Sequence, residues 1–216
     1  MTRTRHLPSL NSLATVALTA AVLAGGLSAC APLLFGGAVV GSGFVVSDRR
    51  TAGTQLEDEA IELKAAAKAR ELATLGHISA TSYNRILLLV GEVPTEADKA
   101  AVGQAVSRIE NVRSVVNELA AMPNSSVGTR SNDVLLSGKV KATFVDAKDL
   151  QSNAFKVVTD RGIVYLMGRV TEREATRGAD LARGIPGVQK VVRVFEVLTE
   201  EELAALSRQG PASAPK

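Results

Sequence analysis

The sequence has few of the side chains on which most catalytic and metal sites depend, with one cysteine and two histidines. A single cysteine excludes an intramolecular disulfide, so packing alone must hold each domain together. His6 lies near the N-terminus and His77 at the start of an expected strand. Neither completes a Ser-His-Asp set or a metal cluster, and no phosphate-binding loop is present. We therefore expect no enzyme activity, no metal ion and no cofactor.

The chain also has few aromatic residues and a small net charge. The chain has no tryptophan, two tyrosines and five phenylalanines, which predicts small aliphatic cores. Lys and Arg number 25 against 22 Asp and Glu, a net charge of +3. Arg3 and Arg5 lie in a segment that we expect to be removed, which leaves 23 − 22, or +1. This balance gives no support for a nucleic-acid partner.

The N-terminal segment has the organisation of a secretory signal. Basic Arg3 and Arg5 precede the apolar run Leu13–Ala24, and small residues lead to Leu27-Ser28-Ala29-Cys30. This pattern resembles a lipobox, in which the cysteine thiol takes a diacylglycerol, residues 1–29 are removed, and the new amine is acylated. The acyl groups on Cys30 would be the only covalent additions expected. The alternative is an ordinary signal peptide followed by an unrelated cysteine.

Residues 30–53 are predicted to be a lipidated, flexible tether. Its apolar part, Leu33–Val46, is rich in glycine. This stretch is too short for a transmembrane helix, which needs about 20 apolar residues. We therefore expect a leader near the bilayer surface, with the lipid as the anchor.

The rest of the chain repeats itself at a nearly constant offset. The matched positions are Ile86–Val93 with Ile163–Val170, Gly91 with Gly168, and Asp58 with Asp133. We expect a first domain over 54–122, a linker over 123–128, a second domain over 129–199 and a tail over 200–216 whose last ten residues are disordered.

Hydrophobic periodicity predicts helix, strand, strand, helix, strand in each copy. The predicted helices are 56–72, one that is capped by Thr95 and runs to residue 108, 133–145 and 172–183, and the closing strands are 112–119 and 188–198. Thr171 and Glu174 form a capping-box pattern. A hairpin followed by a right-handed crossover gives a three-stranded mixed sheet with both helices on one face. The predicted fold class is α+β, with two tandem αββαβ domains.

Charge distinguishes the two copies. Residues 54–121 carry 7 basic and 10 acidic side chains, a balance of −3, whereas residues 129–198 carry 12 and 8, a balance of +4. In the second copy, Leu136, Val140 and Phe144 recur at helical spacing beside Lys139 and Lys141. A helix with an apolar face and basic shoulders suits a membrane interface. The same stripe also suits a core helix, and we expect these three apolar residues to be largely core.

The doubled αββαβ unit, the glycines Gly91 and Gly168, and the Ile-x-Asn/Gly-Val turn before each last strand resemble the BON domain. Two such domains behind a lipobox resemble dual-BON outer-membrane lipoproteins. The segments Asp48–Gln55 and Leu166–Ala175 resemble the division- and outer-membrane-stress-associated lipid-binding family. This resemblance implies a lipid-anchored, periplasm-facing outer-membrane protein that supports envelope integrity. It also implies binding of anionic phospholipid, such as phosphatidylglycerol, through the second domain.

The resemblance places Leu135 and Val140 at apolar lipid-contact positions, and Lys139 and Lys141 at basic ones. The chain departs from related proteins in having Leu135 where they carry an aromatic residue, and aromatic rings favour the interface. A soluble periplasmic stress protein is excluded if Cys30 carries lipid, and two functions stay open for a lipidated chain. One is the lipid-binding lipoprotein. The other is an adaptor whose BON domains dock an envelope assembly machine or a cell-wall enzyme activator, with lipid contact secondary.

Overall fold

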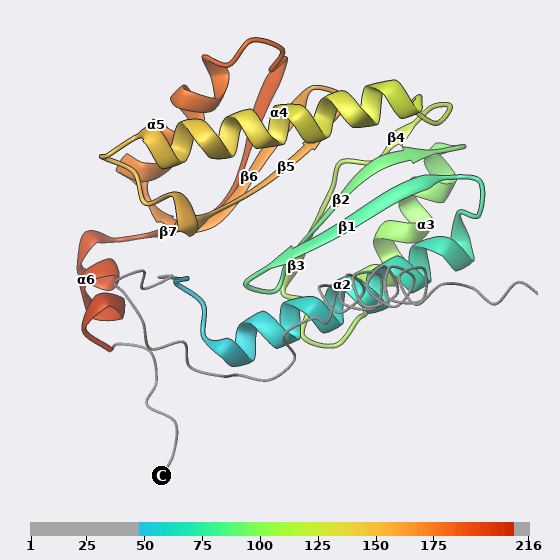
Figure 1. Ribbon diagram of the computed structural model, residues 1–216. Coiled ribbons are helices and arrows are strands. Elements are labelled where there is room, and N and C mark those ends of the chain that lie inside the picture. The colour runs from blue at the N-terminus through green and yellow to red at the C-terminus, as the bar shows by residue number, and fades with distance from the viewer. Residues whose placement is uncertain (1–47, 210–216) are drawn as a thin grey trace, which may run out of the picture. The chain divides into compact units, whose positions relative to one another are not determined.

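The computed structural model describes residues 48–209. The predicted signal peptide, Cys30 and most of the predicted tether therefore lie outside the described residues. Along the described chain the elements occur in the predicted order, twice over (Figure 1). Both copies are α+β units with a mixed sheet, and the predicted fold class is confirmed.

The first domain has its strands in the order β1-β2-β3, with α2 and α3 on one face. Its elements are α2 (Ala52–Leu72), β1 (His77–Tyr83), β2 (Ile86–Val93), α3 (Glu96–Val106), β3 (Ser114–Asn117) and β4 (Ala120–Ala121). Strand β1 pairs antiparallel with β2, and β3 pairs parallel with it. The short β4 also pairs parallel with β2, so the predicted closing strand is interrupted rather than continuous.

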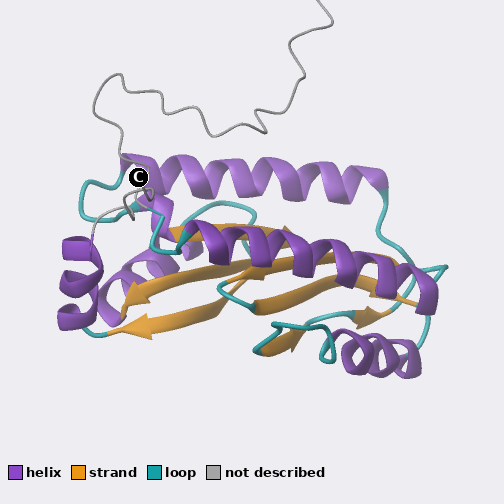
Figure 2. Ribbon diagram, turned by 90° about the horizontal axis from the view of Figure 1, so that it is seen from below, coloured by secondary structure: helices purple, strands orange, loops and turns teal. Residues whose placement is uncertain are grey.

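The second domain repeats this plan in the order β5-β6-β7. Its elements are α4 (Val127–Asp146), the 3-10 turn η2 (Ser152–Ala154), β5 (Phe155–Asp160), β6 (Ile163–Thr171), α5 (Glu172–Arg183) and β7 (Lys190–Leu198). A further helix, α6 (Glu200–Gln209), follows within the predicted tail. In each sheet a long helix runs alongside the strands that it covers (Figures 1 and 2). The capping box of Thr171 and Glu174 is present at the start of α5.

A buried aspartate on the first helix of each copy holds the following hairpin turn. Asn84 and Arg85 have positive φ, as do Arg161 and Gly162, which is the backbone conformation of a type I′ turn. The carboxylate of Asp58 accepts the N–H groups of Asn84 and Arg85, each at 2.8 Å. In the second copy, Asp133 accepts the N–H groups of Arg161 and Gly162 at the same distance. The Asp58–Asp133 match of the repeat is therefore explained by turn capping.

Helix α5 ends at Arg183, as predicted, whereas α3 ends at Val106, two residues before its predicted end. Asn111 and Gly187 have positive φ in the turn that leads to the last strand.

The central strands are buried on both faces. In β2, Leu87 and Leu89 pack against α2 and α3, whereas Leu88 and Val90 point to the opposite side. In β6, Val164 and Leu166 pack against α4 and α5, whereas the alternate residues Tyr165 and Met167 face away from them. The outward sets meet in a third core, completed by Tyr83 and Val194. The two sheets therefore pack face to face, and the helix pairs form the outer layers.

Candidate membrane-binding face

Helix α4 begins at Val127, earlier than the predicted start at Asp133, and supplies the candidate site. Its N-cap is Ser126, whose hydroxyl accepts the N–H of Thr129 at 3.1 Å. The side that faces the sheet consists of Asp133, Leu136, Val140 and Phe144. The three apolar residues belong to the core of the second domain, as predicted.

The outward side of α4 is also apolar. The exposed fractions are 70% for Val127, 72% for Val134, 65% for Leu135 and 69% for Val145. At about 100° per residue, the three valines fall within about 20° of one line along the helix. Gly138 lies on the same line, and a Cβ at that position would meet nothing within 4 Å. Helix α4 therefore has an exposed aliphatic ridge in addition to its buried stripe.

Two lysines flank this ridge. Lys141 lies about 40° to one side of the valine line, and Lys139 about 120° to the other, beyond Leu135. Both residues are exposed, and within residues 48–209 neither ammonium group forms an ion pair or a hydrogen bond. In the first domain the lysines on α2 are paired, Lys64 with Glu110 at 3.7 Å and Lys68 with Glu71 at 2.8 Å. The two lysines of α4 are therefore free of ion pairs, whereas those of α2 are not.

Each lysine also lies at the edge of a hollow. Lys139 lines an open groove of about 690 Å³ between α4 and α5, whose apolar part is formed by Ala142, Leu181, Ile185 and Pro186. Lys141 lines a smaller hollow of about 330 Å³ together with Asp48, Val145 and the edges of Phe144 and Phe155. The surface around α4 thus combines shallow apolar depressions with rims of mixed charge, because Asp146 and Asp180 also line the groove and Asp48 the smaller hollow.

The structure separates the four predicted contact residues. Leu135, Lys139 and Lys141 lie together on the exposed part of α4. Val140 is 0% exposed and packs inside the second domain, so its side chain is a core residue and not a surface contact in this fold. Sequence reasoning missed Val127, Val134 and Val145. Ser126, a good N-cap residue, is the signal that could have found Val127. The separation of eleven residues between Val134 and Val145 already places those two on one side of the predicted helix.

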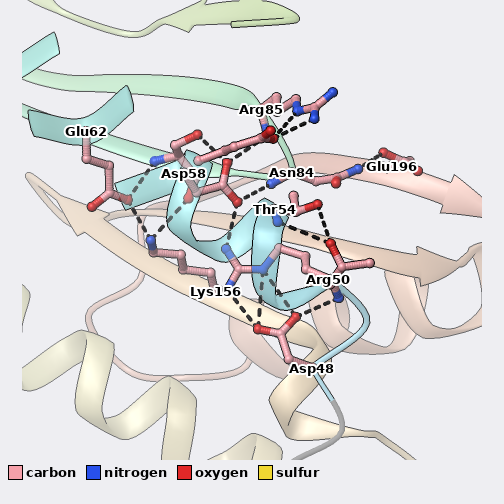
Figure 3. Close-up of polar contacts among 12 residues, drawn as sticks. Asp48, Arg50, Thr54, Asp58, Glu62, Asn84, Arg85, Lys156 and Glu196 are labelled. Atoms are coloured by element: carbon pink, nitrogen blue, oxygen red, sulfur yellow. Dashed lines mark hydrogen bonds and ion pairs between the residues drawn. The ribbon is translucent and has the colours of Figure 1, made fainter. Parts of the chain in front are cut away.

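Charged side chains join the two domains at the rim of the sheet-to-sheet core (Figure 3). Lys156 of β5 binds Glu62 of α2 at 2.7 Å. Glu196 of β7 accepts from Asn84 at 2.5 Å and from Arg113 at 2.7 Å. Burial of Glu196 works against its ionised form, but these partners hold its pKa below the ordinary 4.5. The candidate face thus belongs to a domain that is tied to its neighbour by apolar and ionic contacts.

The described residues show no other candidate centre. From residue 48 to residue 209, no three or more His, Cys, Asp or Glu side chains are grouped to hold a metal ion. Over the same residues, no helix combines the length and apolar character needed to cross a membrane.

The first comparison with known proteins matches both copies of the repeat. The family model described as BON domain matches residues 58–123 and 132–199. The chain is 37% identical over 176 residues to the outer membrane lipoprotein DolP of Haemophilus influenzae, covering 80% of this chain and 90% of that protein. It is 30% identical over 151 residues to the 21 kDa hemolysin of Actinobacillus pleuropneumoniae, covering 68% and 78%. It is 31% identical over 108 residues to the osmotically-inducible protein Y of Escherichia coli, covering 48% and 54%.

Proposed function

This chain belongs to the BON-domain family, among its dual-domain outer-membrane lipoproteins, and from that premise we propose that it supports envelope integrity by binding anionic phospholipid. The anchor in this proposal is the lipid on Cys30. The binding surface is the outer face of α4, formed by Val127, Val134, Val145 and Leu135 with Lys139 and Lys141.

The observation that carries the proposal is the combination of apolar ridge and unpaired charge on one helix. Exposed valine and leucine side chains can enter the boundary between head groups and acyl chains, where burial of each CH₂ contributes about 0.8 kcal/mol. Each lysine near an anionic surface contributes about 1 kcal/mol. Neither Lys139 nor Lys141 would have to leave a carboxylate partner within residues 48–209 in order to bind. The apolar and the electrostatic contributions therefore both favour binding to an anionic bilayer.

The first domain offers a weaker surface for anionic lipid. Its outer helix α2 also exposes leucines, Leu56 and Leu63. However, Lys64 and Lys68 are paired with glutamates, and residues 54–121 carry a balance of −3 (7 − 10). An anionic bilayer would repel this net charge. The difference between the domains favours the second as the lipid-binding one.

Vesicle flotation with the unlipidated mature chain tests the proposal. The chain from Ala31 onward should float with vesicles that contain phosphatidylglycerol and remain unbound with pure phosphatidylcholine. Added salt should weaken binding, because the Debye length is about 10 Å at 0.1 M. Equal binding to both vesicle types would contradict a preference for anionic lipid, and binding to neither would favour docking to an envelope protein.

Lipidation is tested separately. Mass spectrometry of the mature N-terminus should show a diacylglycerol and an N-acyl chain on Cys30. Cys30→Ala should leave the precursor uncleaved, because the thiol that accepts the lipid is gone. A free, unmodified thiol on Cys30 would contradict the anchor.

A further inference from the structure

The first described residues of the chain insert into the second domain. Arg49 lies in the predicted tether, yet its side chain is only 4% exposed and forms an ion pair with Glu174 of α5, which is 5% exposed. Two hydrogen bonds, of 2.7 and 2.8 Å, join the guanidinium to the two carboxylate oxygens. The guanidinium also donates to the carbonyl oxygen of Arg169 at 2.8 Å and to Gln151 at 3.0 Å. In return, Arg169 donates to the carbonyl oxygen of Arg49 at 2.9 Å.

The next residue binds the other domain. Arg50 donates to Asp58 of α2 at 2.8 Å (Figure 3). Its guanidinium also lies over the ring of Tyr83, 4.2 Å from the ring centroid. Asp48 accepts from Arg50 at 2.8 Å. The chain is therefore fixed to the second domain at Arg49 before it forms the first helix of the first domain.

The same contacts place the start of the folded unit beside α4. Asp48 lines the smaller hollow together with Lys141 and Val145, two residues of the outer face of α4. In the sequence, only positions 31–47 separate Asp48 from Cys30. The point at which the tether joins the folded unit is thus next to the surface that we propose to bind lipid.

We infer that Arg49 is a positioning residue that directs the lipid anchor and the α4 face toward the same bilayer. This inference rests on the proposed function of α4. A flexible chain as long as positions 31–47 has a root-mean-square span of about 23 Å. A compact unit of about 160 residues has a radius of gyration of about 15 Å. The tether is therefore short enough that its point of attachment decides which face meets the membrane, and the anchor raises the effective concentration of lipid at α4.

The test compares how far α4 enters the bilayer in lipidated variants of the protein. A polarity-sensitive fluorophore on Val134→Cys reports contact with the bilayer, since Cys30 is occupied by lipid. Arg49→Met combined with Glu174→Gln removes both buried charges and releases the chain from the second domain, so that it is held only at Arg50 on the first domain. A short Gly-Ser insertion before Asp48 is the matched control, because it lengthens the tether and keeps the Arg49 contacts. We expect the double variant to lose about half or more of the fluorophore's blue shift, and the insertion to keep most of it.

The unlipidated forms separate this inference from the proposed function. Without lipid, the double variant should bind phosphatidylglycerol vesicles as the parent does, because α4 is unchanged. Should neither unlipidated form bind, the proposed function fails. Should both bind while the lipidated double variant keeps the full blue shift, the role of Arg49 fails. If the double variant does not fold, Arg49→Lys, which retains the charge but loses the bidentate geometry, is measured in its place with the same two outcomes.

Discussion

The two repeat glycines are required for different reasons. Gly91 has φ of +117°, and a Cβ there would lie 2.0 Å from the carbonyl oxygen of His77. Gly168 has no such backbone conformation, but its Cβ would lie 2.3 Å from the carbonyl oxygen of Ala154. The repeat alone predicts that both glycines are structural. The close approach of neighbouring backbone at Gly168 depends on how η2 meets β6, which no local pattern encodes.

Gly168→Val should therefore destabilise the protein by about 1–3 kcal/mol, because the added side chain must displace backbone. Thermal unfolding measures this as a lower Tm, by about 3 °C for each kcal/mol. Gly138→Ala is the control, since that glycine lies in a helix with open space around it, and it should keep or raise the Tm. A Gly168→Val protein that melts like the parent would show that β6 tolerates a side chain there.

Buried carboxylates make stability depend on pH. Burial by itself raises the pKa of Asp58, but hydrogen bonds from the Arg85 N–H, the Ser82 hydroxyl and Arg50 outweigh it and hold the pKa below 3.8. The pKa of Glu174 is also lowered: burial opposes this, and its bonds to Arg49 outweigh burial. A lowered pKa in the folded state contributes stability above the unfolded pKa, and this is lost as pH falls. Asp160, whose pKa burial raises, opposes the trend.

We expect the free energy of unfolding to decrease as pH falls below about 4, the ordinary range of these carboxyl groups. Asp58→Asn should be less stable than the parent at pH 7 and should lose less stability on acidification. Urea unfolding at neutral and acidic pH measures how the free energy of unfolding changes with pH in each protein. An identical change in both proteins would show that Asp58 does not contribute to the loss of stability in acid.

At the scale of the element, α4 has two apolar sides with different roles. The 3.6-residue period predicts the buried side, and the structure confirms Leu136, Val140 and Phe144 as core. The exposed side was predicted only in part. Val134 and Val145 share one side of the predicted helix, but Val127 joins them only when the helix is extended, because the predicted linker had assigned that residue to a loop.

Leu135→Glu and Val140→Ala should separate the two sides of α4. Leu135→Glu should change stability by less than about 0.5 kcal/mol, because the side chain is exposed, and should weaken vesicle binding. Val140→Ala should cost about 2 kcal/mol of stability through lost burial and a cavity, with binding unchanged while the protein is folded. Circular dichroism measures the stability of each variant, and vesicle flotation measures its binding. The reverse pattern would place Leu135 in the core.

At the scale of the whole molecule, the sheets pack on each other through a core that the sequence signals indirectly. The run Ile86–Val90 is apolar at consecutive positions, which is typical of a strand buried on both faces. That run predicts a second cover for the sheet, but it does not identify the partner as the other copy. The Arg49–Glu174 pair joins positions 125 residues apart, so no local spacing could have predicted it.

The central claim is that α4 of the second domain binds anionic lipid, and charge reversal tests it most directly. Lys139→Glu with Lys141→Glu changes the charge of the helix by four units, two at each position. At about 1 kcal/mol for each basic residue lost, affinity for phosphatidylglycerol vesicles should fall at least about tenfold, with the fold intact by circular dichroism. The matched variant in the first domain, Lys64→Glu with Lys68→Glu, should bind nearly as the parent does. Equal flotation of the two folded double variants would contradict the account.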